Sequence, residues 1–164
     1  MSSAKHQEQF QHFYNEYQAM VYTLCLGYMK GDKDLAKDLT QEVFIQVWRA
    51  LPKFRQEASP KTWIYRICVN TCLLHIRNNK KFDAQAIDEQ HANMPHQTES
   101  RDKYEELYRA IGALNDVDRI IIMLVLDEMK YEEIAAVTGI KEGNLRVKIH
   151  RIKQRLNELM NNHG

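Results

Sequence analysis

The feature that most constrains this chain is a regular apolar stripe near its C-terminal end. Between residues 142 and 160, branched apolar residues recur at steps of four, three, four and three: Leu145, Ile149, Ile152, Leu156 and Leu159. Because an α-helix has 3.6 residues per turn, such a stripe lies on one side of a helix and has to be buried. A shorter helical pattern precedes it over Tyr131 to Val137, and Gly139 between the two can adopt the positive φ of a tight turn. The pattern predicts a helix-turn-helix.

The face opposite this stripe carries residue types that read DNA. At 100° per residue, this face contains Val147, His150, Arg151 and Gln154, with Arg146 at its edge and Lys148 on its flank. Arginine can bridge two acceptors of guanine, and valine can touch the methyl group of thymine. A lysine on the flank lies where a phosphate would be. The alternative is an ordinary amphipathic helix with a solvated charged face, but the short helix and the glycine turn at the right distance favour a recognition helix.

Helical patterns also dominate the rest of the chain. Apolar spacings predict helices over about 8–30, over a ladder from Leu35 to Val47, over about 61–79, and from Tyr104 to Leu114. A further helix is expected over 119–128, with Asp116 or Asp118 as its cap. Residues 83–100 are polar and have no apolar period, which is typical of a flexible linker. We therefore predict an all-α protein with one small helical domain over 1–82, a linker over 83–100, and a second domain over 101–164.

Charge along the chain is segregated, although the net charge is only +1. Residues 49–82 carry a balance of +7 and residues 141–164 a balance of +4, whereas residues 83–106 carry −5. Two basic blocks separated by an acidic segment indicate two separate contacts with a polyanion.

The predicted helix over 61–79 is apolar nearly all round, so it should be buried on several sides. Its remaining polar residues form a narrow stripe of Arg66, Asn70 and Arg77, which can line a path for nucleic acid. Phe54, Tyr65 and Trp63 lie near a basic loop and suit the stacking of unpaired bases, but taken alone such aromatic residues are more often part of a core.

Two segments of the chain match a pattern that we recognise. Residues 34–70, DLAKDLTQEVFIQVWRALPKFRQEASPKTWIYRICVN, closely resemble the second conserved region of bacterial sigma factors. Residues 131–156, YEEIAAVTGIKEGNLRVKIHRIKQRL, resemble the fourth region. The compact, two-domain extracytoplasmic-function class is the best match. The resemblance implies a protein that binds core RNA polymerase, directs it to promoter DNA and supports melting of the duplex, and that an anti-sigma factor holds inactive.

The resemblance also implies three sets of site residues. The set expected to face the clamp helices of the polymerase's largest subunit is Asp34, Asp38, Gln41, Glu42 and Gln46. The loop from Phe54 to Ser59 would capture a flipped base of the −10 element; with the helical stripe, the set expected there is Phe54, Arg55, Ser59, Trp63, Arg66, Asn70 and Arg77. The set expected over the −35 element is Arg146, Val147, Lys148, His150, Arg151 and Gln154.

Other kinds of function fit the sequence less well. It contains no glycine-rich phosphate loop and no nucleophile motif, so we expect neither an enzyme nor a small-molecule substrate. Cys68, Cys72 and His75 have a spacing that can present three metal ligands, but no fourth ligand is evident, and we expect no metal site and no cofactor. No apolar run is long enough to span a membrane, and we expect a cytoplasmic protein. The remaining alternative is a helix-turn-helix regulator that binds duplex DNA without polymerase.

Overall fold

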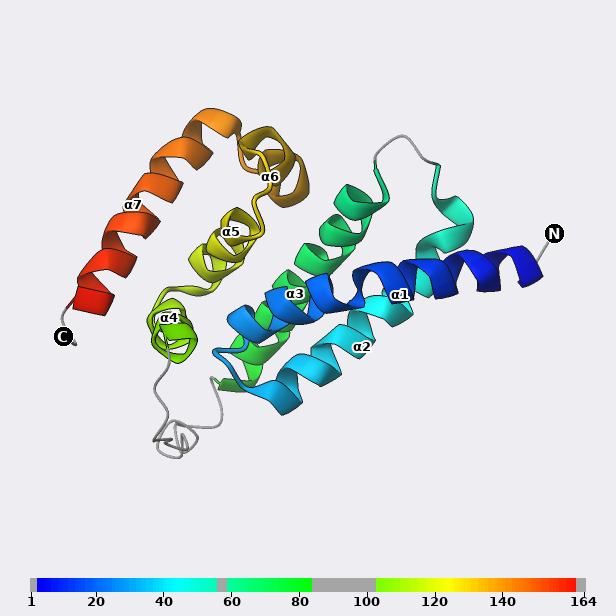
Figure 1. Cartoon of the computed structure of the whole chain (residues 1–164), viewed down its shortest axis with the longest axis horizontal. Coiled ribbons are helices and arrows are strands. Elements are labelled where there is room, and N and C mark those ends of the chain that lie inside the picture. Colours follow the sequence, from blue (N-terminus) through cyan, green and yellow to red (C-terminus); the bar gives the residue numbers. More distant parts are fainter. Residues whose placement is uncertain (1–2, 56–58, 84–102, 162–164) are drawn as a thin grey trace.

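The computed structural model describes residues 3–55, 59–83 and 103–161, and these residues form helices and no strand (Figure 1). The elements in chain order are α1 (Ser3–Tyr28), α2 (Lys33–Ala50), the 3-10 turn η1 (Leu51–Lys53), α3 (Pro60–Asp83), α4 (Lys103–Gly112), α5 (Asp116–Leu126), α6 (Tyr131–Thr138) and α7 (Glu142–Asn161). The predicted all-α fold is confirmed. Apart from Asp83, the last residue of α3, the predicted linker lies outside the described residues. No helix among the described residues is both long and apolar enough to cross a membrane.

The corner between α1 and α2 is fixed by a few residues. Gly31 adopts a φ of 87°, in the left-handed region that glycine enters without a steric penalty. Asp32 then caps α2, since its side chain accepts hydrogen bonds of 3.1 Å from the backbone N–H groups of Asp34 and Leu35. The corner folds α2 back along α1 (Figure 1).

Helix α3 is buried on several sides, as its apolar composition predicts. It packs against α1 and α2 and also against α5 and α6. Ile64, Tyr65 and Val69 are therefore all buried. Two leucines that the apolar patterns predict to be buried are exposed. Leu35 of α2 and Leu74 of α3 have 46% and 50% of their surface exposed, because both line a groove between the two helices.

Helix α5 forms the centre of the C-terminal half. It is almost wholly apolar, and it packs against α1, α3, α4, α6 and α7. The predicted cap of this helix was wrong, because Asn115 caps it by accepting a 2.9 Å hydrogen bond from the backbone N–H of Asp118. Asp116 and Asp118 lie instead in the first turn, where their negative charges interact favourably with the positive end of the helix dipole.

The helix over 104–114 was predicted with only partial success. Helix α4 ends at Gly112, so Leu114 lies beyond it, although Leu114 is buried as expected. Tyr104 opens the predicted apolar pattern but is 71% exposed.

The helix-turn-helix is confirmed in α6 and α7. Gly139 ends α6 with a φ of 82°, and its N–H donates to the carbonyl of Ala135 at 2.8 Å. The stripe on α7 is buried over Leu145, Ile149, Ile152 and Leu156, and Leu159 is partly buried.

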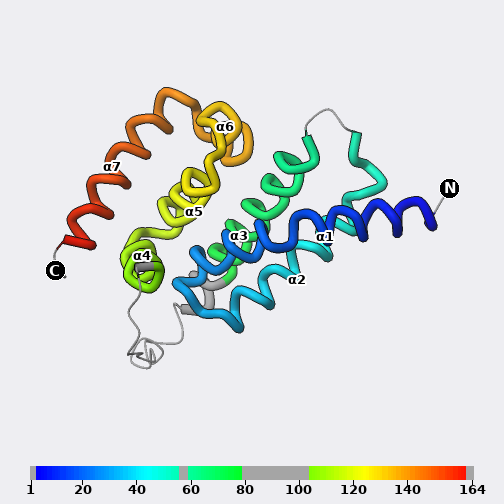
Figure 2. The backbone as a smooth tube through the Cα atoms, viewed as in Figure 1, coloured from blue at the N-terminus to red at the C-terminus, as the bar shows by residue number. Residues whose placement is uncertain are grey.

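The two halves of the chain pack directly against each other, which the sequence did not predict. α1 contacts α4 and α5, and α3 contacts α5 and α6, while α7 lies on the far side of α5 (Figure 2). Gly27 of α1 lies so close to Met123 of α5 that a Cβ at Gly27 would be 2.2 Å from the Met123 sulfur.

Arg119 of α5 joins the two halves at one buried point. Its Nε donates to the carbonyl of Tyr28 at 2.9 Å, and its Nη1 donates to the carbonyl of Leu114 at 2.8 Å. Its guanidinium group lies 5.1 Å from the centre of the Tyr28 ring and is ion-paired with Asp116. A second contact is the ion pair between Lys61 and Asp127, at 3.3 Å. We call this packing of the two halves the closed arrangement. It is held by the buried hydrogen bonds of Arg119 and by the apolar contact between Gly27 and Met123.

Candidate nucleic-acid and polymerase interfaces

The outer face of α7 is exposed as the sequence predicts. Arg146, Val147, His150, Arg151 and Gln154 are all exposed. Val147 is 53% exposed in the middle of this basic face. No contact between α7 and α1, α2 or α3 is present among the described residues, so the face remains open when the two halves are packed together.

Ion pairs restrict the basic side chains of α7 to different degrees. Arg146 pairs with Glu142 at 3.1 Å, and its guanidinium group lies 5.2 Å from the centre of the Tyr131 ring on α6. Lys148 is half-buried and lies 3.9 Å from a carboxylate oxygen of Asp118. No ion pair holds Arg151 in the part of the chain that the structure describes, so its guanidinium group is available to a partner.

The sequence analysis did not predict these ion pairs, although the sequence indicates one of them. Glu142 lies four residues before Arg146, which is the spacing of a helical ion pair. The approach of Lys148 to Asp118 crosses from α7 to α5 and has no such local signal.

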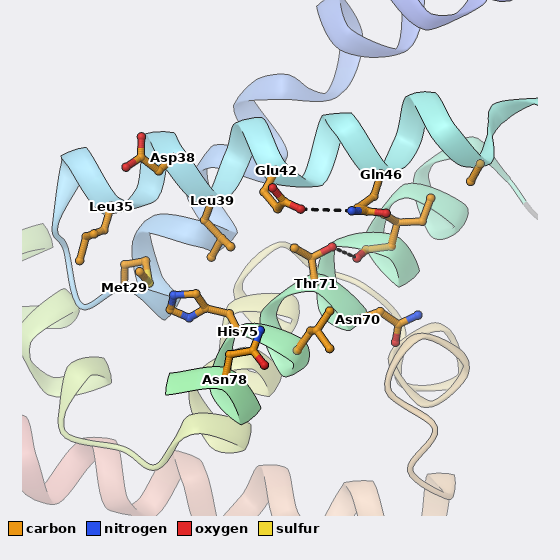
Figure 3. A pocket seen from close by; sticks show the side chains of 13 residues that line it. Met29, Leu35, Asp38, Leu39, Glu42, Gln46, Asn70, Thr71, His75 and Asn78 are labelled. Carbon is orange, nitrogen blue, oxygen red and sulfur yellow. Dashed lines mark hydrogen bonds between the residues drawn. The ribbon is translucent and has the colours of Figure 1, made fainter. Parts of the chain in front are cut away.

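A groove of about 620 Å³ runs between α2 and α3 (Figure 3). Leu39, Glu42 and Gln46 line it from α2, whereas Thr71, His75 and Asn78 line it from α3 (Figure 3). The amide of Gln46 donates to the Glu42 carboxylate at 3.1 Å, which orders this acidic wall. The groove combines one acidic wall with exposed apolar residues at Leu35 and Leu74, a surface suited to an amphipathic protein segment.

The groove brings two predicted sets together. Asp38, Glu42 and Gln46, expected to bind polymerase, share its lining with Asn70, which was expected at the −10 element. Asp34 and Gln41 are exposed on α2 but do not line the groove.

The aromatic residues expected near the −10 element form part of the core. The rings of Phe54 and Trp63 lie 4.4 Å apart between their centres, and Phe13 of α1 contacts Phe54 edge-on at 5.9 Å. Phe54 and Trp63 are nevertheless only half-buried, so part of each side chain is exposed. Residues 56–58 of the predicted base-capturing loop lie outside the described residues.

Ser59 has a local structural role that the prediction did not include. Its hydroxyl accepts a 3.1 Å hydrogen bond from the backbone N–H of Thr62 and donates to the Thr62 hydroxyl at 3.0 Å. Ser59 therefore caps α3, and the Ser59–Pro60 pair at a helix start was the available signal. Arg55, Arg66, Asn70 and Arg77 are exposed, as a nucleic-acid path requires.

Comparison with known families finds two matching regions in this order. Residues 13–82 match the family model for Sigma-70 region 2, and residues 104–156 match that for Sigma-70, region 4. The ECF RNA polymerase sigma-E factor of Escherichia coli strain K12 is 31% identical over 154 residues, covering 84% of this chain and 79% of that protein. The ECF RNA polymerase sigma factor SigE of Mycolicibacterium smegmatis is 29% identical over 152 residues; the match covers 88% of this chain but only 58% of that relative.

Two solved structures share the fold. The sigma factor RpoE from Bartonella quintana, in complex with the anti-sigma factor NepR, aligns with a TM-score of 0.76 and 20% identity over 94% of this chain and 98% of that one. CnrH, in complex with the cytosolic domain of CnrY, aligns with a TM-score of 0.69 and 18% identity over 96% and 91%. The relatives support the polymerase-dependent interpretation and not the alternative of a regulator that acts without polymerase.

Proposed function

We propose a division of labour between the two halves of this chain, which belongs to the sigma-70 family of RNA polymerase sigma factors and to its extracytoplasmic-function class. Sigma factors are transcription initiation factors and not enzymes. The chain binds core RNA polymerase, directs it to specific promoters and supports DNA melting. The observation that carries this proposal is the presence of two separate surfaces, the open basic face of α7 and the polar groove between α2 and α3.

The α7 face is proposed to read the −35 element in the major groove. Arg151 is free to make a bidentate contact with guanine, and the exposed methyl groups of Val147 can pack against a thymine methyl. Arg146 is already oriented by Glu142 and Tyr131, so it loses less side-chain freedom on binding than a fully mobile arginine would. Lys148 has to leave Asp118 before it can contact a phosphate.

The N-terminal half is proposed to bind polymerase and the −10 element. Asp38, Glu42 and Gln46 offer an acidic and amide surface to the polymerase. Asn70, with the exposed Arg66 and Arg77, contacts the single strand, and the exposed parts of Phe54 and Trp63 give a base a surface on which to stack. Removing a base from the duplex costs a few kcal/mol, which these contacts offset.

The closed arrangement has to open for this function. The −10 and −35 elements lie about 25 base pairs apart by position, which is roughly 85 Å at 3.4 Å per base pair. Direct packing of α5 against α1 and α3 cannot place the two surfaces at such a separation. We propose that the described arrangement is the resting state, and that binding to polymerase and promoter favours the open state.

An inhibitory protein is also proposed as a partner. Both solved relatives were determined with a second protein, in one case an anti-sigma factor. The groove between α2 and α3 accepts an amphipathic helix, with Leu35 and Leu74 as apolar contacts, and such a helix would cover Asp38 and Glu42. We expect the protein in the cytoplasm, with the polymerase and the DNA.

Run-off transcription tests this proposal. Purified core polymerase and the full chain are incubated with genomic fragments, and the 5′ ends of the transcripts are sequenced. We expect starts that share one −35 and one −10 sequence and that vanish without the chain. Glu42→Ala should reduce binding to core polymerase, whereas Glu16→Ala, at an exposed site on α1, should not. Sequence-specific binding to duplex DNA by the chain alone, with no effect on transcription by core polymerase, would contradict the proposal.

A further inference from the structure

The three cysteines of this chain meet at one buried point, although they come from two helices. Cys25 belongs to α1, and Cys68 and Cys72 lie one turn apart on α3. All three are fully buried, and their sulfur atoms lie within 4.8 Å of one another. These are all the cysteines in the sequence, so no thiol of the chain lies elsewhere.

The spacing of the sulfur atoms is close to that of a metal site. With zinc–sulfur bonds of about 2.3 Å in a tetrahedron, neighbouring sulfur atoms lie about 3.8 Å apart. The cluster therefore needs a contraction of about 1 Å or less to hold an ion. A disulfide would require two sulfur atoms to approach to about 2.05 Å and would leave the third cysteine out.

The buried cluster offers a cation three sulfur ligands from two helices. Cysteine binds a metal ion as the thiolate, and buried thiolates are costly without a compensating positive charge. A cation that replaces the thiol protons supplies that charge.

A fourth ligand and a compensating charge lie nearby. His75 follows Cys72 by one turn of α3, and its ring contacts that of Tyr28, which follows Cys25 by one turn of α1, at 5.9 Å between centres. The guanidinium group of Arg119 lies 5.1 Å from the centre of the same Tyr28 ring, so a positive charge lies beside the ring that His75 contacts. Three thiolates and one Zn²⁺ leave a single negative charge that Arg119 can balance, whereas Cu⁺ would leave two.

We propose that Cys25, Cys68 and Cys72 form a structural Zn²⁺ site, which His75 completes, and that the ion fastens α1 to α3. Binding replaces the three thiol protons, which are released to solvent, so that a Zn(Cys)₃ unit with neutral His75 carries one negative charge. His75 turns towards the sulfur atoms to coordinate the ion. The site lies within the N-terminal half and is separate from the α7 face, whereas His75 also lines the groove between α2 and α3.

Cobalt substitution tests the site in the full chain. The chain is purified under reducing conditions without oxygen, freed of metal with a chelator, and titrated with Co²⁺ and then with Zn²⁺. We expect one Co²⁺ per chain, a thiolate-to-cobalt charge-transfer band, displacement by Zn²⁺, and a melting temperature that rises with zinc and falls with chelator. His75→Ala should keep the charge-transfer band but change the visible cobalt bands.

Matched variants separate metal binding from packing. Cys25→Ala and Cys72→Ala should lose the charge-transfer band, whereas Val69→Ala, which also removes buried volume from α3, should keep it. Three outcomes would overturn the proposal: a folded native chain without the band, cysteine variants that retain it, or retention of Cu⁺ in place of Zn²⁺ when both ions are supplied. A disulfide from Cys25 to Cys68 or Cys72 in the chain as isolated would also overturn it.

Discussion

A single methyl group at Gly27 should separate the two halves of the chain. Gly27 lies in the last part of α1 and faces Met123 of α5. In Gly27→Ala, the new Cβ would be 2.2 Å from the Met123 sulfur, more than 1 Å short of the 3.4 Å at which ordinary contact begins, and 2.6 Å from the Met123 Cγ. Overpacking of this kind costs about 1–3 kcal/mol.

The same substitution should also make α1 more stable as a helix. Alanine in place of glycine inside a helix gains about 0.5–1 kcal/mol. This gain applies to the closed and open states alike, whereas the clash with Met123 exists only in the closed state. The equilibrium between the two states should therefore shift towards the open state by about 5- to 150-fold.

Small-angle X-ray scattering measures this shift. A compact chain of this length has a radius of gyration of about 15 Å, and we expect a clear increase in Gly27→Ala. Adding Met123→Ala, which removes the obstructing side chain, should restore the smaller value. Ala19→Leu, at an exposed site on α1, is the control. An unchanged radius of gyration in Gly27→Ala, or an increase that Met123→Ala does not reverse, would refute the proposal that a clash with Met123 opens the two halves.

Three further predictions concern the α7 face, melting and pH. Arg151→Ala should lose about 1–3 kcal/mol of discrimination between −35 sequences in binding assays with the holoenzyme; equal weakening on every sequence would make Arg151 a phosphate anchor instead. Asn70→Ala should reduce permanganate reactivity of the −10 thymines and leave binding to the upstream duplex unchanged, whereas normal reactivity would remove Asn70 from the melting step. Burial and the nearby Asp127 carboxylate raise the pKa of Tyr65 well above its ordinary value of about 10. The folded state thus holds this proton more tightly than the unfolded state, so stability should fall above about pH 10 by about 1.4 kcal/mol per pH unit for this group. Urea unfolding at pH 9 and 11 checks the sign, and Tyr65→Phe should lose less stability between the two pH values than the native chain.

Local patterns predicted much of the fold because their physical causes are local. The α7 stripe, the turn at Gly139 and the burial of α3 on several sides each follow from helical periodicity or from backbone freedom. The cap of α5 was mispredicted because Asn115, Asp116 and Asp118 all have suitable side chains, and only the backbone path selects Asn115. Exposure of Leu35 and Leu74 depends on how α2 and α3 diverge, which periodicity does not encode.

In the candidate sites, too, local features could be predicted from the sequence and long-range contacts could not. Exposure of Arg151 and Val147 follows from the position of each residue on one helix, and the structure agrees. Contacts between distant segments could not be predicted, because nothing in a single sequence pairs Gly27 with Met123 or Cys25 with Cys68. These long-range contacts account for the closed state and the thiol cluster.

The distance between the two halves during initiation tests the central proposal most directly. Fluorescent labels on exposed residues of α1 and α7 report it by energy transfer, first in the free chain and then with core polymerase and promoter DNA. We predict a short distance in the free chain and a separation on the order of 85 Å in the complex, as the spacing of the promoter elements requires. A short distance that persists in complexes able to start transcription would contradict the proposal that the two halves separate to bind the −10 and −35 elements.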